Sequence, residues 1–369
     1  MNNLSKLIFS IFLALSLFGI ICIYSASFSI HLVTKQIVAL VIGLICFFVA
    51  SRIDLEKLKQ YLIPIVIGNI ILLVLVLTPL GIEVNGSKAW INLGIVNFQP
   101  SELAKIAIVL YTSYFISARM NIIENFKKGF VPPFILMLVF VFLINLEPDL
   151  GNAAIIGLIF LSIMFIGGTP LWHFLPLVVF SIIGFLFLLF SESYRVKRIL
   201  AFMNPWADPL GYGYNIIQSL IAHGRGHIWG VGLGNSTQKH YYLPEKHTDF
   251  IYSVIGEELG LVANLIIVLI FLTFFTLMIF RISKINDVFY KLLAFGLTFM
   301  IFINAVINMS VTLSLLPATG VTLPFISYGG TSLIVNWIAI GLIVNIINKP
   351  INNKKINFRD KIVIENNAY

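Results

Sequence analysis

Long apolar stretches alternate with short polar segments along the whole chain. Each stretch is close to the length of about 20 residues that a helix needs to cross a bilayer. Ten of them can be delimited: residues 7–27, 33–50, 61–79, 101–118, 130–145, 151–168, 171–190, 255–280, 289–314 and 329–348. Backbone polar groups in lipid must bond within the protein. The pattern therefore predicts an all-α, polytopic membrane protein, a bundle of ten transmembrane helices.

The composition agrees with a membrane protein. Hydrophobic residues make up 59% of the 369 and charged residues only 11%, whereas soluble domains carry about 25% charged residues. The first apolar stretch has no clear cleavage site after it, so we expect a retained helix rather than a signal peptide. Cys22 and Cys46 both lie inside apolar stretches, and we expect them to pack as small apolar side chains.

The basic residues predict the orientation. The chain has 24 Lys and Arg residues and a formal net charge of +8. With the N-terminus inside, 15 of them fall in the short inner segments and 3 in the short outer ones. Short connections rich in Lys and Arg face the cytoplasm. We therefore expect both termini in the cytoplasm, with a transmembrane domain at residues 1–348 and a short cytoplasmic tail at residues 349–369.

Two outer connections are longer than simple linkers need to be. They are residues 79–100 and residues 191–248, and the second holds the remaining 6 Lys and Arg residues together with Trp, Tyr and His. Disordered linkers are poor in aromatic residues, and long ordered loops usually carry function. We expect the large outer loop, residues 191–248, to fold back on the bundle.

The stretch "PEKHTDFIYSVIGEELG" leads from that loop into the eighth predicted helix. We expect this helix to begin near Thr248, which places Asp249 in its first turn. Asp249, Ser253, Gly256 and Gly260 then repeat at helical spacing and form one small, polar face that a large ligand could approach. The alternative for Asp249 is an acidic residue favoured at that position by the helix dipole alone.

Two further acids follow in the same helix, Glu257 and Glu258. Charged side chains that face lipid are costly, so both cannot do so. We expect at least one of them to pair inside the bundle, and the sequence does not identify its partner.

Three other segments carry candidate chemistry. The cations Arg195, Lys197 and Arg198 could form either a solvated face or a site for phosphate oxygens. The segment "NGSKAW" contains Lys88 and Trp90, and "FQPSELAK" starts the fourth helix with Ser101 as a candidate N-cap; capping and an interfacial Trp would explain both without further function.

The segment "LPATGVTLPFISYGGTSLIVN" is uncharged and rich in Gly and Pro. Irregular backbone at membrane depth is tolerated where it lines a cavity or is buried in protein, and a loop without chemistry is the alternative. The chain contains no Gly-Lys-Ser/Thr nucleotide loop and no His-Glu-x-x-His zinc motif. ATP-driven pumping by this chain alone is therefore not expected.

Five stretches in this order resemble the SEDS family (shape, elongation, division and sporulation proteins). They are "NGSKAWINLG", "FQPSELAK", "EPDLG", the long run from "NPWADPLGYGYN" to "EKHTDFIYSVIGEELG", and "LPATGVTLPFISYGGTSLIVN". The resemblance covers about residues 7–347. It implies a peptidoglycan glycosyltransferase that polymerises lipid II, an undecaprenyl-pyrophosphate-linked disaccharide pentapeptide, into β-1,4 glycan strands. The residues "NPWADP" favour the division branch, hence the division septum of a bacterial cytoplasmic membrane.

The resemblance also implies partners and residue roles. The partners are a class B penicillin-binding protein, which is a transpeptidase, and other divisome proteins.

The aspartate of "HTDF" is the proposed catalytic residue of the family, which is Asp249 here. Our candidates for substrate contacts are Lys88, Arg198 and Lys246 at the pyrophosphate, with Arg195 as a weaker candidate. Trp90 is a candidate for a contact with sugar or lipid, and Glu245 is a candidate for orienting the loop. Ser253 is a candidate for a substrate contact on the small face of the helix. Ala89 departs from the family, many members of which have two basic residues before the Trp, and this weakens a two-cation clamp at Lys88.

One carboxylate base is enough for this reaction, because pyrophosphate leaves without protonation when cations offset its charge. No cofactor is evident; a divalent cation on the pyrophosphate is chemically reasonable, although no cluster of metal ligands argues for one. Three alternatives stay open: a flippase that transports lipid II, a scaffold without catalysis of its own, and the elongation-type polymerase of the same family.

Overall fold

The computed structural model describes residues 2–84, 86–92, 94, 97–176 and 193–349. Nine of the ten predicted stretches coincide with helices in this part of the chain, and the tenth, residues 171–190, lies mostly outside it. The long helices are α1 (Asn3–Ser27), α2 (Ile30–Ala50), α4 (Leu62–Leu77), α5 (Pro100–Ala118), α6 (Val131–Leu146), α7 (Leu150–Ile166), α12 (Ile251–Ile282), α13 (Val288–Thr312) and α14 (Gly330–Asn348). The all-α class is confirmed.

Shorter elements connect these helices. They are α3 (Leu55–Gln60), β1 (Gly81–Val84), β2 (Ser87–Asn92), β3 (Asn97–Phe98), η1 (Met120–Ile122), η2 (Phe126–Phe130), η3 (Leu171–His173), α9 (Ser193–Met203), η4 (Pro205–Ala207), α10 (Tyr214–Gly226) and α11 (Gln238–Tyr241). The three strands form one small antiparallel sheet in the order β1-β2-β3, with Ile82 opposite Trp90 and Ile91 opposite Phe98.

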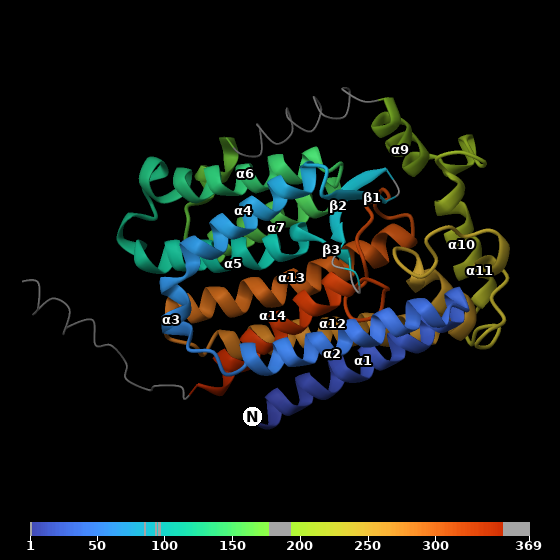
Figure 1. Ribbon diagram of the computed structural model, residues 1–369, viewed down its shortest axis with the longest axis horizontal. Helices are drawn as coiled ribbons and strands as arrows, with labels where there is room; N and C mark the ends of the chain where they lie inside the picture. Colours follow the sequence, from blue (N-terminus) through green and yellow to red (C-terminus); the bar gives the residue numbers. More distant parts are fainter. Residues whose placement is uncertain (1, 85, 93, 95–96, 177–192, 350–369) are drawn as a thin grey trace, which may run out of the picture.

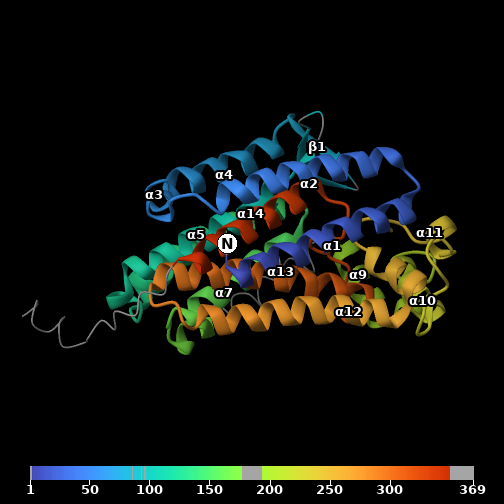
Figure 2. The same ribbon diagram turned by 90° about the horizontal axis from the view of Figure 1, so that it is seen from below.

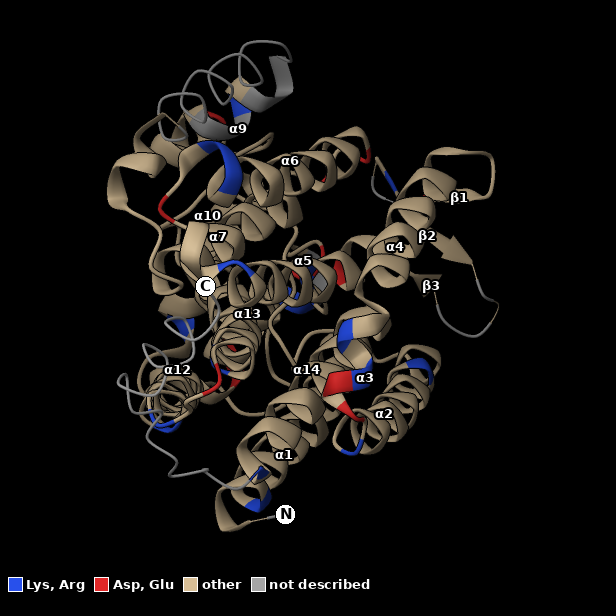
Figure 3. Cartoon of the chain, turned by 90° about the vertical axis from the view of Figure 1, so that its left-hand side faces the viewer, with Lys and Arg blue, Asp and Glu red and all other residues tan. Residues whose placement is uncertain are grey.

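The long helices lie side by side, and the two ends of the bundle differ (Figures 1 and 2). One end carries the small sheet together with α10 and α11, and the other carries α3. Asn2 and the end of α14 meet at the α3 end, where the Asn2 amide donates to Asn348 Oδ1 over 2.9 Å. Figure 3 looks onto that end and shows Lys and Arg around α3.

Among the described residues, six helices are long and apolar enough to cross a membrane by their length and composition: α1, α2, the continuous helix of residues 126–146, α12, α13 and α14. Two of them form the centre of the bundle, since 78% of the apolar window of α13 and of α14 is buried, against 28% for α2 and for α12. The outer helices expose apolar residues such as Ile45 and Leu269 to their surroundings. This is the arrangement expected when lipid rather than water is the solvent.

Helix α12 differs from its prediction at both its start and its middle. It begins at Ile251 instead of near Thr248, so Asp249 precedes the helix rather than lying in its first turn. It is also broken at Gly260, which has φ 78°. The small, polar face predicted from Asp249 to Gly260 is therefore wrong as a continuous helical surface.

A segment of the large loop fills this break in α12. The N–H groups of Leu261 and Val262 donate to the carbonyls of His227 (3.0 Å) and Ile228 (3.3 Å), while the carbonyls of Glu257 and Glu258 accept from Val231 (3.0 Å) and Gly232 (2.9 Å). In an unbroken helix the same N–H groups would bond the same two carbonyls. The inserted segment, residues 227–232, thus replaces two helical bonds by four bonds to the loop.

Glycines allow the inserted segment to approach α12 this closely. A Cβ atom on Gly230 would lie 2.1 Å from the carbonyl oxygen of Glu258, and one on Gly260 would lie 2.3 Å from that of Ile228. Both residues also have positive φ, at 81° and 78°, which glycine adopts without steric cost. Close backbone packing therefore explains Gly230 of the loop and Gly260 of α12.

Candidate active site

Four segments that are distant in sequence meet at the sheet end of the bundle. The Gln99 amide donates to Thr331 Oγ1 over 3.0 Å, and Gln99 Nε2 donates to Asp149 Oδ2 over 3.2 Å. A Cβ on Gly151 would lie 2.3 Å from the carbonyl oxygen of Thr319. The Gly- and Pro-rich segment, residues 318–331, is thus the hub that joins the start of α5 to the start of α7.

The same hub holds the backbone just before Asp249. The Tyr328 amide donates to the His247 carbonyl over 2.8 Å, and Ser327 Oγ donates to the Thr248 carbonyl over 2.7 Å. The Asp249 carbonyl accepts from Asn308 Nδ2 on α13 over 2.8 Å, and the same amide nitrogen donates to Val321 over 2.7 Å. Three successive residues of "HTD" are therefore fixed to the centre of the bundle.

The carboxylate of Asp249, unlike its backbone carbonyl, is not held by a hydrogen bond from another described residue. It is partly exposed, and none of the hydrogen bonds between described residues involves its oxygens. Burial, followed by the negative charges of Glu245 and Asp149, raises the pKa of Asp249 to about 7. The positive-φ Gly320 faces it, since a Cβ there would lie 3.8 Å from Asp249 Oδ2. A carboxylate in this state is suited to accept a proton near neutral pH.

Two acids before α7 extend this site. Asp149 caps α7 by accepting from the amide of Asn152 (3.0 Å) and from its Nδ2 (2.7 Å), and burial raises its pKa. Glu147 is fully buried, and within the described residues its carboxyl oxygens have no hydrogen-bond partner. Burial, followed by the charge of Asp149, raises the pKa of Glu147 to about 9. Glu147 is accordingly neutral at pH 7.

The sequence indicated "EPDLG" only as one of the stretches that resemble the family, and it predicted no role for these acids. The signal that could have found them is two acids in a short turn between two apolar stretches.

The N-cap predicted for α5 is wrong. This helix begins at Pro100 with Gln99 as its N-cap, so Ser101 lies inside the helix and is not the cap. In the next turn of α5, Lys105 donates to Glu102 (2.8 Å) and to Asn304 of α13 (3.1 Å), and the three side chains form a buried cluster.

The predicted contacts in the first outer segment lie on β2. Lys88 is half-buried and its Nζ donates to the Leu77 carbonyl over 3.4 Å. Trp90 is also half-buried, and it pairs with Ile82 across the sheet. The Lys88 ammonium has further donors beyond this one long hydrogen bond.

Glu245 shapes the turn before Asp249. It has φ 48°, its carbonyl accepts from the amides of Thr248 and Phe250, and its carboxylate accepts from Thr248 Oγ1 over 2.9 Å. Ser253 lies differently from our expectation, because it is fully buried and shares a 2.6 Å hydrogen bond with Ser219 of α10. Helix α10 covers the face of α12 that we expected a ligand to approach.

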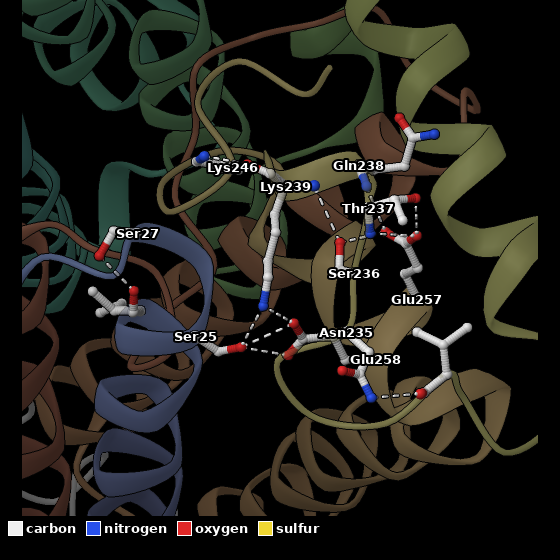
Figure 4. A network of polar contacts seen from close by, with 12 residues as sticks. Ser25, Ser27, Asn235, Ser236, Thr237, Gln238, Lys239, Lys246, Glu257 and Glu258 are labelled. Carbon is white, nitrogen blue, oxygen red and sulfur yellow. Dashed lines mark hydrogen bonds and ion pairs between the residues drawn. The ribbon is translucent and has the colours of Figure 1, made fainter. Parts of the chain in front are cut away.

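The pairing expected for the two glutamates is confirmed for both (Figure 4). Glu257 is buried and accepts from Ser236 Oγ and from the amides of Thr237 (3.2 Å) and Gln238 (3.3 Å) at the start of α11. Its Oε1 also lies 3.6 Å from Nε of Arg225. Glu257 thus holds α11 against α12.

Glu258 forms an ion pair with Lys239, at 2.5 Å, and both side chains are buried. Ser25 of α1 donates to the Glu258 carboxylate and accepts from Lys239 Nζ over 3.0 Å. The backbone carbonyl of Lys239 in turn accepts from Nζ of Lys246. This network links α1, α11 and α12 to the segment that carries Asp249 (Figure 4).

The cations of α9 are only partly described. Lys197 is exposed, with Nζ 5.8 Å from the centre of the Tyr212 ring. The side chains of Arg195 and Arg198 lie outside the described residues. The anion-binding role expected of Arg198 therefore stays a prediction.

Comparisons with known proteins agree over nearly the whole length. The profile of a family described as cell cycle protein, which covers FtsW, RodA and SpoVE, matches residues 5–351. A probable peptidoglycan glycosyltransferase FtsW of Geobacter metallireducens is 39% identical over 90% of this chain and 92% of its own. The protein of the same name from Coxiella burnetii is also 39% identical, over 90% of this chain and 93% of its own.

Solved structures show the same fold. A chain from a peptidoglycan synthase complex, described as coordinating polymerization and crosslinking, superposes with a TM-score of 0.79 at 28% identity, over 93% of this chain and 96% of that one. The rod shape determining protein RodA of Thermus thermophilus superposes with a TM-score of 0.67 at 26% identity, over 93% of this chain and 95% of that one.

Proposed function

Because the chain belongs to the FtsW/RodA/SpoVE family of cell cycle proteins, we propose that it is a peptidoglycan glycosyltransferase of the FtsW type. Its substrate is lipid II, and its product is the β-1,4 glycan strand of septal peptidoglycan. The single observation that carries the catalytic assignment is Asp249, a partly exposed carboxyl of pKa about 7 whose backbone is fixed to the centre of the bundle.

Asp249 acts as the general base in an inverting displacement. The 4-hydroxyl oxygen of the acceptor sugar forms a bond to the anomeric carbon of the donor, and its proton passes to the Asp249 carboxylate. The bond from that carbon to the pyrophosphate oxygen breaks, and the electron pair leaves with undecaprenyl pyrophosphate. A glycosidase also needs an acid, because its leaving group is an alkoxide; pyrophosphate does not need one when cations offset its charge.

Lys88, Lys246 and Arg198 supply those cations in our proposal. Lys88 and Lys246 each donate one hydrogen bond to a backbone carbonyl, and an ammonium group has three donors. Both can therefore reach phosphate oxygens without losing the contact that positions them. Trp90, on the strand that carries Lys88, packs against sugar or lipid.

The orientation follows from the distribution of the basic residues. We place the α3 end in the cytoplasm, because 15 of the Lys and Arg residues then lie in inner segments and 3 in short outer ones. The sheet, α10, α11 and Asp249 then lie at the outer face, where the lipid-linked sugars are polymerised. We further propose that the protein works at the division septum with a class B penicillin-binding protein and other divisome proteins, which the synthase complex of the related structure supports for the transpeptidase.

The test is polymerisation of purified lipid II by the reconstituted protein together with a transpeptidase partner whose own active site is inactivated. Wild type is expected to form glycan chains, and Asp249→Asn is expected to be slower by about 10²–10⁴, the usual contribution of a general base. Asp287→Asn is a matched control, because Asp287 caps α13 through its side chain and Asn caps equally well. Wild-type polymerisation by Asp249→Asn combined with a loss of lipid II translocation would support the flippase instead.

A further inference from the structure

The segment inserted into the break of α12 presents large apolar side chains to its surroundings. Trp229 is 79% exposed, Ile228 is 56% exposed, and Leu233, which follows the segment, is 54% exposed. None of them takes part in the site described above. Their exposure calls for an explanation, because they lie on a well-fixed backbone rather than on a loose loop.

The hydrogen bonds of the segment determine its depth relative to the membrane. After the break, α12 runs through residues 261–282, roughly 33 Å at 1.5 Å per residue, which matches a hydrocarbon core about 30 Å thick. The far end of this stretch carries Arg281 and Lys284, so Leu261 lies at the opposite boundary of the hydrocarbon. Since Leu261 and Val262 donate to His227 and Ile228, the inserted segment lies at that boundary too.

The side chains have the chemistry that this depth favours. Tryptophan is enriched at the membrane–water interface, where its apolar ring and its polar N–H are both accommodated. Leu261 and Leu265 of α12, which are 52% and 50% exposed, continue the apolar surface into the hydrocarbon. An exposed apolar surface that begins at the interface and runs along a spanning helix is covered by lipid.

We propose that Ile228, Trp229 and Leu233 form a membrane anchor that inserts into the interfacial region of the leaflet beside the outer end of α12. The ligand is the glycerol and upper acyl region of ordinary phospholipids. The anchor fixes the height of the loop, because the chain continues directly to Ser236 and Lys239, which bond to Glu257 and Glu258. This role rests on the proposed function: the anchor keeps Asp249 at the height at which the pyrophosphate of the lipid-linked substrate leaves the membrane surface.

A second exposed group of apolar residues provides the control. Met203, Trp206 and Leu210 are 75%, 64% and 89% exposed. They belong to α9, η4 and the turn that follows. Figure 1 shows α9 away from α12, and the backbone hydrogen bonds of the described residues 204–213 stay within this stretch of the chain. Exposure alone therefore does not predict insertion; the bonds to α12 do.

The test is tryptophan fluorescence of the full-length protein, reconstituted without any partner into phosphatidylcholine vesicles brominated at a shallow or at a deep acyl position. Shallow bromine is expected to quench Trp229 at least twofold more than deep bromine does. Trp229→Phe should remove this quenched component, and Trp206→Phe should leave it in place. Both substitutions are conservative and at exposed positions, so folding is retained.

The anchor is overturned if Trp229→Phe leaves the quenched fraction equal to that of the wild type in both lipids. It is also overturned if the component lost in Trp229→Phe emits as a water-exposed indole. The double variant Ile228→Ser/Leu233→Ser should lower the quenching of Trp229 by at least twofold, because it weakens the insertion of the segment. None of these measurements requires enzymatic activity, so failure of the anchor and failure of the proposed function are distinguishable.

Discussion

Asp249 combines a fixed backbone with a carboxylate that described residues leave without a hydrogen bond. Asn308, Ser327 and Tyr328 hold the backbone around it, while burial and two neighbouring acids raise its pKa to about 7. An ordinary aspartate is deprotonated at all physiological pH values but is a weak base. The raised pKa makes Asp249 a stronger base that is still half-deprotonated near neutrality, which is the compromise that general-base catalysis favours.

The first prediction is a pH dependence of kcat/KM. Only deprotonated Asp249 accepts a proton, so the rate should rise with pH and level off above about 7. Glu245→Gln removes a negative charge that raises this pKa, so it should shift the midpoint to lower pH, whatever it does to the maximal rate. The pH–rate profile of lipid II polymerisation measures both. A midpoint that moves to higher pH in Glu245→Gln would contradict the electrostatic account.

The second prediction concerns Glu147, whose folded pKa of about 9 lies far above its usual value of 4.5. The folded state then holds this proton more tightly than the unfolded state, so stability falls as pH rises from about 4.5 towards 9. Glu147→Gln mimics the protonated form and should stabilise the protein by roughly 1–3 kcal/mol at pH 8 but hardly at pH 4.5. Thermal unfolding in detergent at the two pH values tests this. Equal effects at both would show that Glu147 is not protonated by burial.

At the scale of elements, the break in α12 couples the large loop to a spanning helix. The inserted segment supplies the partners that the helix loses at Gly260. Glu257 and Glu258 then bind the next part of the loop from the same turn of α12. One turn of helix therefore positions the chain from Gly226 to Lys239, and through Lys246 it reaches the segment that carries Asp249.

The third prediction compares two glycines of this loop. Gly230→Ala should destabilise the protein by at least about 1–3 kcal/mol, because the added Cβ meets the Glu258 carbonyl and residue 230 has a positive φ. Gly224→Ala, in α10, has nothing within 4 Å of its added Cβ and should stabilise by about 0.5–1 kcal/mol. Thermal unfolding of both variants provides the comparison. Similar midpoints for the two would contradict the insertion.

The fourth prediction concerns the ion pair of Lys239 and Glu258. Both are buried, and loss of one partner leaves the other charge uncompensated, so Lys239→Met should cost about 3–5 kcal/mol of stability. Lys239→Met combined with Glu258→Leu removes both charges and should recover part of that loss. A double-mutant cycle by thermal unfolding measures the coupling. Strict additivity of the two losses would mean that the two charges do not interact.

The hydrophobic pattern was sufficient to predict the helices but not the break in α12. Residues 261–280 carry no charged side chain, and Gly260 alone does not specify a kink. The break exists because residues 227–232 supply backbone partners, and such tertiary bonds leave no periodic signal. The start of α12 differs from the prediction for a similar reason: the carbonyls of residues 247 and 248 accept from the hub, and that of Asp249 accepts from Asn308 of α13, so these residues form no first helical turn.

The candidate site was predictable only in part. Asp249 stands out because it is an acid at the end of a spanning stretch. Asp149 and Glu147 do not, because their approach to Asp249 depends on the packing of residues 318–331 against α7. Ser253 was misplaced in the proposed face because the sequence does not reveal that α10 covers it.

The whole molecule separates a polar end from an apolar bundle. Both ends of the described chain lie toward the end of the bundle that carries α3, whereas the sheet, α10, α11 and the acids of the site lie at the other end. In the proposed orientation the lipid-linked substrate reaches the site from the outer leaflet, and the growing strand leaves into the space where a transpeptidase partner crosslinks it.

The central claim is that Asp249 performs chemistry and does not merely bind substrate. The most direct measurement is the rate of glycan formation by Asp249→Asn at saturating lipid II, beside the affinity of the same variant for lipid II. The account predicts a rate lower by about 10²–10⁴ with affinity within threefold of the wild type. Wild-type turnover by Asp249→Asn, or a loss that saturating substrate restores, would contradict it.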